Sequence, residues 1–187
     1  MKVSREQAAR NRETVVETAS RLFRAQGVDG VGIGDVMRAS GLTHGGFYNQ
    51  FASKEALAAE ACAAALEKSA ERWRALAGQA DDPARAIAND YLSARNRDSP
   101  EAGCALVGLG ADAARQGGAL AEAFGAGLET LAAILRQAAP DMDRATTLAR
   151  LAQMVGAVAL ARGVSDPSLS DEIMAAARQA AGLDSAG

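Results

Sequence analysis

The sequence predicts an all-α fold, and three observations carry that prediction. Alanine and leucine dominate the 187 residues whereas valine, isoleucine and aromatic residues are scarce, a composition that favours helix over sheet. Apolar residues recur at steps of three and four through most of the chain, as they do on one face of an amphipathic helix. Capping residues precede several of these segments and glycine or proline follows them, which is typical of helix boundaries.

The N-terminal part of the chain contains four predicted helices. The first lies between Ser4, a good N-cap residue, and Gly27, which ends it. The second covers about 33–40. A short third helix starts after Thr43 and a long fourth helix starts after Ser53, because both residues cap helices well.

The remaining helices are predicted from their starts and their apolar stripes. Asp82-Pro83 and Ser99-Pro100 each place a capping residue before a proline at the first helical position. Gly117-Gly118 and Pro140 interrupt the later part of the chain. The expected helices lie near 83–97, 101–116, 120–139, 141–162 and 168–181.

Charge is divided unevenly along the chain. Residues 1–54 carry eight Lys and Arg against five Asp and Glu, a net charge of +3, and the remaining residues sum to −6. A basic N-terminal segment joined to an acidic remainder is consistent with an N-terminal domain that contacts nucleic-acid phosphates, although chance could produce a charge asymmetry of this size. The same boundary separates the two domains that we expect, 1–54 and 55–187.

Residues 33–55, IGDVMRASGLTHGGFYNQFASKE, predict a helix-turn-helix, because two short helices are joined by a tight turn at Gly41. Apolar side chains would pin this pair against the first helix. In such a motif the second helix enters the major groove and its first residues meet base edges. The apolar set is Ile33, Val36, Met37, Leu42, Phe47 and Phe51, and the outward set is Thr43, His44, Gly45, Tyr48 and Asn49.

The string SGLTHGGFYNQFASKEAL resembles the signature of the TetR family of transcription regulators. The resemblance is specific over about residues 10–60 and only architectural beyond them. It implies a homodimer that binds a palindromic operator in double-stranded DNA, most often as a repressor released by a small-molecule effector. The matching residues are Gly41, Leu42, Phe47, Tyr48, Phe51, Ser53, Lys54, Glu55 and Leu57.

The resemblance also assigns roles within the motif. The side chains for base edges are those of Thr43 and His44, with Gly45 allowing close approach to the DNA. The expected phosphate contacts come from Tyr48, Asn49 and Lys54, and less directly from Arg38 and Ser40. Tyr48 could instead pack against the protein, and His44 and Lys54 could be ordinary solvated residues.

The chain departs from the family pattern at two places. Gly32 stands where Thr or Ser often caps the second helix, so only a backbone N–H could bind phosphate there. The adjacent Gly45 and Gly46 leave few side chains for direct readout. We therefore expect modest base contacts and more reliance on backbone contacts and DNA shape.

By the same resemblance, the helical body dimerises and binds the effector. The helices at 141–162 and 168–181 would form a four-helix bundle with those of a partner, unless their apolar stripes only build the core of one subunit. The candidates at this interface are Leu148, Leu151, Val155, Val158, Leu169 and Ile173. An apolar cavity would lie among the helices of 57–138. The candidate wall residues, each of which could also be plain core, are Trp73, Tyr91, Cys104, Val107, Leu120, Phe124 and Leu128.

Cys104 has a second interpretation. It lies near an expected helix start, where the helix dipole would lower the pKa of a thiol and favour reaction with electrophiles or oxidants. The alternative is a buried, inert cysteine. Cys62 and Cys104 are far apart in sequence, so neither a disulfide framework nor a zinc site is indicated.

Other classes of protein find little support. The single histidine, His44, leaves almost no material for a catalytic triad or a metal site, and no Gly-rich phosphate loop is present, so we expect no enzyme and no cofactor. No run approaches the ~20 apolar residues of a membrane span. The polar N-terminus lacks a signal-peptide core, so we expect a cytoplasmic protein without membrane contact. A DNA-binding activator or architectural factor that needs no ligand remains the alternative to a ligand-responsive regulator.

Overall fold

The computed structural model describes residues 4–182, and within that range it contains helices and no strand. This confirms the predicted all-α fold. The elements in chain order are α1 (Arg5–Gln26), α2 (Ile33–Ala39), the 3-10 turn η1 (His44–Gly46), α3 (Lys54–Ala77), α4 (Pro83–Tyr91), α5 (Ala94–Asp98), α6 (Ala105–Gln116), α7 (Gly118–Ala138), α8 (Arg144–Gly163) and α9 (Pro167–Ala180).

Helix boundaries follow local capping chemistry. The hydroxyl of Ser4 accepts a hydrogen bond from the Gln7 backbone at 3.1 Å, and Ser53 caps α3 in the same way. Gly27 ends α1 with a φ of 74°, a conformation that side chains rarely adopt. Asp82 caps α4, with Pro83 in its first turn. These four predicted boundaries are confirmed.

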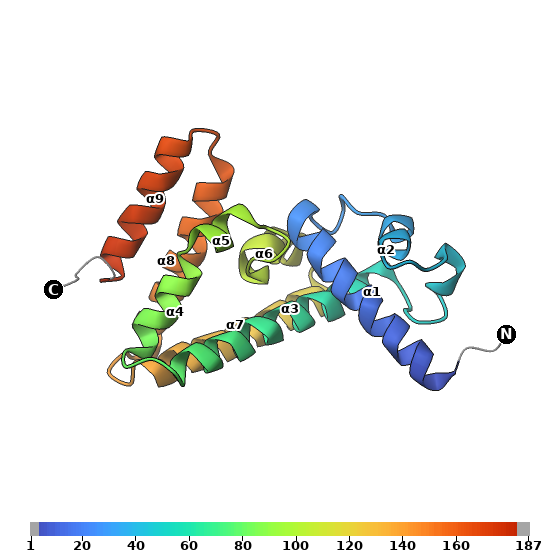
Figure 1. Cartoon of the computed structure of the whole chain (residues 1–187), viewed down its shortest axis with the longest axis horizontal. Coiled ribbons are helices and arrows are strands. Elements are labelled where there is room, and N and C mark those ends of the chain that lie inside the picture. The colour runs from blue at the N-terminus through green and yellow to red at the C-terminus, as the bar shows by residue number, and fades with distance from the viewer. Residues whose placement is uncertain (1–3, 183–187) are drawn as a thin grey trace.

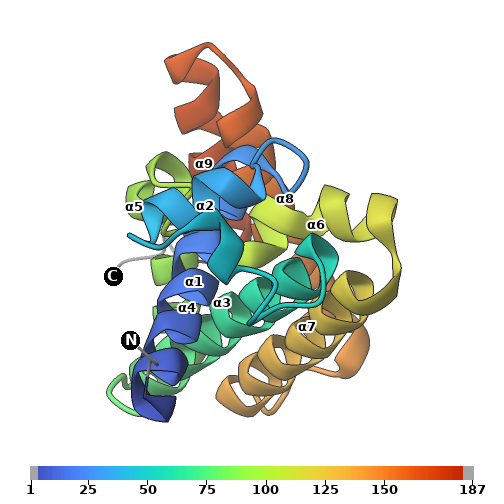
Figure 2. The same ribbon diagram turned by 90° about the vertical axis from the view of Figure 1, so that its right-hand side faces the viewer.

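The long helices set the shape of the molecule. α3 and α7 lie side by side along the body, α1 lies across the start of α3, and α2 and η1 form one end (Figure 1). The α8–α9 hairpin stands at the opposite end. Figure 2, viewed from the α2 end, shows α3 between α1 and α7. The helix-turn-helix segment and the last two helices therefore lie at opposite ends of the folded molecule.

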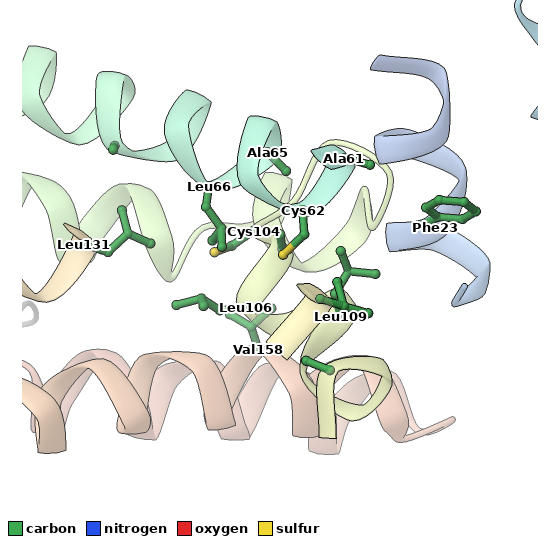
Figure 3. Packing of buried hydrophobic residues seen from close by; sticks show 14 of the residues in the cluster. Phe23, Ala61, Cys62, Ala65, Leu66, Cys104, Leu106, Leu109, Leu131 and Val158 are labelled. Atoms are coloured by element: carbon green, nitrogen blue, oxygen red, sulfur yellow. The ribbon is translucent and has the colours of Figure 1, made fainter. Parts of the chain in front are cut away.

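One apolar core joins the two ends. Figure 3 shows Phe23 of α1, Cys62 of α3, Leu109 of α6 and Val158 of α8 within this core, and all four are fully buried. Close packing of this kind transmits displacement from one element to the next. The N-terminal helix is therefore packed on the body, and α6 contacts both α1 and α8.

A glycine sets the distance between α3 and α7. A Cβ atom placed on Gly127 would lie 2.7 Å from Leu66 Cβ and 2.9 Å from Leu66 Cγ. Such separations are too short for carbon atoms in contact, so the two helices approach this closely only because residue 127 has no side chain.

Three predicted helices have different boundaries in the structure, and one of them, expected from 141, begins at Arg144 because Asp143 caps it. The helix expected near 83–97 is divided at Leu92, because Ser93 caps a new helix by accepting a hydrogen bond from the Asn96 backbone at 3.3 Å. The helix expected from 101 begins at Ala105 instead. The preceding residues form tight turns, and Gly103 lies so close to Asn96 that a Cβ would be 2.9 Å from its side-chain oxygen.

α7 departs from the expectation that no segment is apolar enough to span a membrane. By length and composition it passes that test, as core helices of soluble proteins also do. It packs against α3, α4, α6 and α8, and its residues Leu120, Leu131 and Leu135 are buried within the described chain.

Candidate functional site

The turn after α2 has the geometry expected of a helix-turn-helix. Gly41 has a φ of 72°, and the Leu42 backbone donates to the Met37 carbonyl at 2.9 Å, which closes the end of α2. Beyond Thr43 the chain forms only the 3-10 turn η1 instead of the short α-helix that we predicted. The adjacent Gly45 and Gly46 explain the difference, because glycine is a poor helix former.

Two phenylalanines fix this turn to the rest of the domain. Phe47 and Phe51 are buried, and their rings stack with centroids 5.5 Å apart. Tyr48 meets the edge of Phe47 at 5.2 Å but leaves 67% of its surface exposed. The Tyr48 ring thus packs against Phe47 while most of its side chain is open to solvent.

The outward set forms one exposed surface. The buried Phe47 is flanked in sequence by residues that point to solvent, so the turn has one anchored and one open side. The exposed residues are Thr43, His44, Gly45, Tyr48 and Asn49. The rings of His44 and Tyr48 lie 6.4 Å apart across this surface.

The residues predicted to contact phosphate differ in whether their polar groups already bind other groups of the protein. Lys54 is the first residue of α3, so its side chain starts from the positive end of the helix. Arg38 is exposed but pairs with Asp35 at 2.8 Å. The Ser40 hydroxyl donates to the Val36 carbonyl at 2.8 Å, so its proton is already used.

The backbone amide of Gly32 is not free either. It donates to the Asp35 carboxylate at 3.1 Å, which is the half of a capping box that does not need a side chain at position 32. We expected that this amide could bind phosphate. In the structure, a phosphate could bind the Gly32 amide only after the hydrogen bond to Asp35 is broken.

Sequence reasoning missed Arg12. Its guanidinium lies 4.7 Å from the centre of the Phe51 ring and pairs with Glu60 at 2.6 Å. It therefore ties α1 to both the turn and α3. No local signal reveals this role, because Phe51 and Glu60 are distant from Arg12 in sequence.

The comparisons with known proteins agree with this geometry. Residues 15–61 match the profile of the family described as bacterial regulatory proteins, tetR family. The N-terminal domain therefore belongs to the TetR family. The solved structures similar to it include a TetR transcriptional regulator from Chloroflexus aurantiacus, with 26% identity over 93% of this chain and 95% of that one and a TM-score of 0.77. No curated protein sequence matches the chain.

Two further structures share the fold of the whole chain. A TetR-family transcriptional regulator from Cytophaga hutchinsonii is 22% identical over 97% of both chains, with a TM-score of 0.75. The reduced form of Escherichia coli NemR is 20% identical over 91% of this chain and 96% of that one, also with a TM-score of 0.75. With a TetR-family DNA-binding domain at its N-terminus, the chain is a transcription regulator and not an enzyme.

A cavity of about 570 Å³ lies between the N-terminal domain and the body of this regulator. Its walls come from α1, α3, α4, α5 and the segment before α6. Of the predicted wall residues, Trp73, Tyr91 and Cys104 line it. The others lie on α6 and α7, pack in or against the apolar core and do not line the cavity; these are Val107, Leu120, Phe124 and Leu128. Sequence reasoning missed the α1 wall, which includes Val16, Ser20 and Arg24.

Cys104 caps α6, as its expected place near a helix start suggested, but its chemistry is the opposite of a reactive thiol. Its side chain is buried, and burial raises the pKa of the thiol. Burial also raises the pKa of Cys62 to about 12. Desolvation therefore outweighs the helix dipole, and both cysteines stay protonated at neutral pH.

The predicted interface residues divide into two groups. Leu151 and Val158 are fully buried within their own subunit, so they are core residues and not available to a partner. Leu169 is exposed, whereas Leu148, Val155 and Ile173 are half-buried. Sequence reasoning missed Leu160, which is 62% exposed on the outer face of α8.

Proposed function

We propose that the chain is a ligand-responsive repressor that binds a palindromic operator as a homodimer and is released by a small molecule. The observation that carries the proposal is the double role of α1. This helix forms one wall of the cavity, and through Arg12 it also supports the turn that contains Phe51. A molecule in the cavity thus touches the helix on which the DNA-binding surface rests.

The exposed surface of η1 supports the DNA contacts. Thr43, His44 and Gly45 would meet base edges, since they start the second helical segment of the motif. Tyr48, Asn49 and Lys54 would bind phosphates and fix the register. The internal bonds of Arg38 and Ser40 make these two weaker candidates.

The outer face of the α8–α9 hairpin supports the homodimer. Leu160 and Leu169 are exposed large apolar residues, and Val155 and Ile173 are partly open beside them. A Cβ on Gly156 would meet no atom, so a partner helix could approach closely there. Two subunits joined by these helices would carry two DNA-binding surfaces, as a palindrome requires.

The cavity supports the response to a ligand. The dimer would have two conformations, one in which its two DNA-binding surfaces fit the operator and one in which they do not. A molecule that binds the second conformation more tightly lowers the affinity for DNA by the same factor. A structural neighbour, RolR, was crystallised in complex with resorcinol; it is 19% identical over 98% of this chain and 97% of that one, with a TM-score of 0.59. We also place the chain in the cytoplasm, with domains at 1–54 and 55–187.

Salt-dependent binding to the DNA upstream of its own gene tests the DNA contacts. Lys54→Ala should weaken binding to all sequences and flatten the plot of log K against log salt by about 2 units per dimer, one for each lost phosphate contact. Arg136→Ala removes an equal charge from the exposed side of α7, far from the turn, and should leave that slope unchanged. An unchanged slope in Lys54→Ala would refute the phosphate assignment.

Sedimentation tests the dimer. Leu160→Glu should yield a monomer with greatly weakened operator binding, because a carboxylate would be buried without a partner charge. Ala133→Glu, on the exposed side of α7, is the matched control and should remain dimeric. If Leu160→Glu also stays dimeric and binds DNA normally, α8 is not the interface. Adding candidate compounds to the DNA titration separates this regulator from a ligand-independent activator or architectural factor.

A further inference from the structure

Arg24 is an unusual cation in the wall of the cavity. Its Nε donates to the Ser20 carbonyl at 2.9 Å and its Nη1 to the Gly103 carbonyl at 2.6 Å. In the described part of the chain no carboxylate lies within ion-pair distance of it, and Glu101 acts on it only from farther away. Burial consequently lowers the pKa of this guanidinium.

Among the other cations in the wall of the cavity, Arg21 and Arg95 are exposed to solvent and two are neutralised. Lys68 pairs with Glu17 at 2.5 Å, and Arg72 pairs with Asp90. A guanidinium has five N–H donors, of which the two carbonyls use two. Arg24 therefore has donors to spare and an uncompensated charge that is partly removed from water, which is costly unless an anion joins it.

Part of the cavity wall is aromatic. The rings of Trp73 and Tyr91 meet edge to face at 5.8 Å, and both residues are buried. The Tyr91 hydroxyl is shut off from solvent and forms no hydrogen bond of normal geometry, since its neighbour, the Cys104 thiol, is a weak partner. Burial raises the pKa of this phenol, so it stays neutral and retains a proton to donate.

We propose that the cavity binds a planar aromatic carboxylate, with its anionic group on Arg24 and its ring against Trp73 and Tyr91. This inference rests on the proposed function, for which it names the class of effector. The volume of about 570 Å³ lies within the usual range for small-molecule sites. Guanidinium and carboxylate match in shape and form short, charge-assisted hydrogen bonds.

The same contact connects the ligand to the DNA-binding domain. Arg24 lies on α1, and its hydrogen bond to Gly103 ties that helix to the segment before α6. Asn96 holds this segment through the Cys104 backbone at 3.0 Å, and Arg162 of α8 donates to the Asn96 carbonyl. A carboxylate that binds the remaining donors of Arg24 pulls on the same guanidinium that holds the Gly103 carbonyl, so its arrival strains the link between α1 and the body.

The test is a binding titration of the full-length protein with matched pairs of probes. The probes are benzoate, salicylate and phenylacetate, each beside its neutral amide, at up to about 10 mM, tenfold above a Kd of about 1 mM. Trp73 is the only tryptophan, so its fluorescence reports on the cavity, and calorimetry provides a second readout. At least one carboxylate should bind about tenfold or more tightly than its amide, as expected for charge-assisted hydrogen bonds.

Variants locate the effect. Arg24→Gln should remove the preference for the carboxylate, and Arg24→Lys should retain part of it. Arg10→Gln makes the same change on α1 outside the cavity and should keep the full preference. If no carboxylate binds the wild-type protein better than its amide, the proposal is wrong, and this outcome does not depend on whether a variant folds.

DNA release separates this inference from the proposed function. Arg24-dependent binding of a carboxylate that leaves the DNA complex intact would uphold the anion site and refute the ligand response. Release of DNA by neutral or cationic compounds, with no dependence on Arg24, would uphold the ligand response and overturn the anion class.

Discussion

Replacing Gly127 with alanine should force α3 and α7 apart. The new Cβ would lie 2.7 Å from Leu66 Cβ, an atom fixed to the α3 backbone, so a rotamer change cannot relieve the overlap. Overpacking costs about 1–3 kcal/mol, and a clash with an atom fixed to the backbone falls in the upper part of that range, about 2–3 kcal/mol; the better helix propensity of alanine returns about 1 kcal/mol. We expect a net loss of about 1–2 kcal/mol, or about 2–8 °C in Tm for a chain of this size.

Gly125→Ala is the matched control on the same helix. A Cβ at this position meets no atom within 4 Å, so only the gain in helix propensity remains, up to about 1 kcal/mol. The two variants should therefore shift the midpoint of thermal and urea unfolding in opposite directions, measured by circular dichroism at equal protomer concentration. Equal or higher stability of Gly127→Ala would refute the close-packing argument.

Three further predictions concern buried and bridging side chains. Thiol reagents should modify Cys62 and Cys104 only after unfolding, and rapid labelling of the native protein would contradict their protonated, buried state. Because the pKa of Cys62 rises from 9.0 in the unfolded chain to about 12, folding stability should fall as pH increases between these values, by about 1.4 kcal/mol per pH unit for this group at most. Cys62→Ala should reduce that fall in urea titrations, and an identical slope in the variant would count against it. Arg12→Ala should cost about 1 kcal/mol through its lost contacts with Phe51 and Glu60, and unchanged urea unfolding would refute the bridge.

Local chemistry accounts for what the sequence predicted well. The caps at Ser4, Ser53 and Asp82 act within one turn of their own helices, so their signals are complete in a few residues. The motif of residues 33–55 was predicted for the same reason. The double glycine of the turn warned of few side chains, but its effect on helix type became visible only in the structure.

Tertiary contacts account for what was missed. An apolar stripe on α8 predicts which residues are buried, but not whether the same subunit or a partner subunit covers them. Leu151 and Val158 pack in their own subunit, whereas Leu160 is exposed. The α1 wall of the cavity arises from helices distant in sequence, so no local pattern marks Arg24. Cys104 lies at a helix start, although α6 begins at Ala105 and not at 101 as predicted, and the burial that decides the thiol pKa depends on the rest of the fold.

Hydroxyl-radical footprinting on the upstream DNA shows whether two copies of the exposed η1 surface bind one DNA site. We expect two protected patches related by a dyad on one side of the duplex, spaced by one helical turn of ~34–36 Å or a multiple of it. Both should disappear together in Leu160→Glu. A single asymmetric patch, or no protection even at low salt, would mean that the η1 surfaces of a dimer do not bind the DNA in this way.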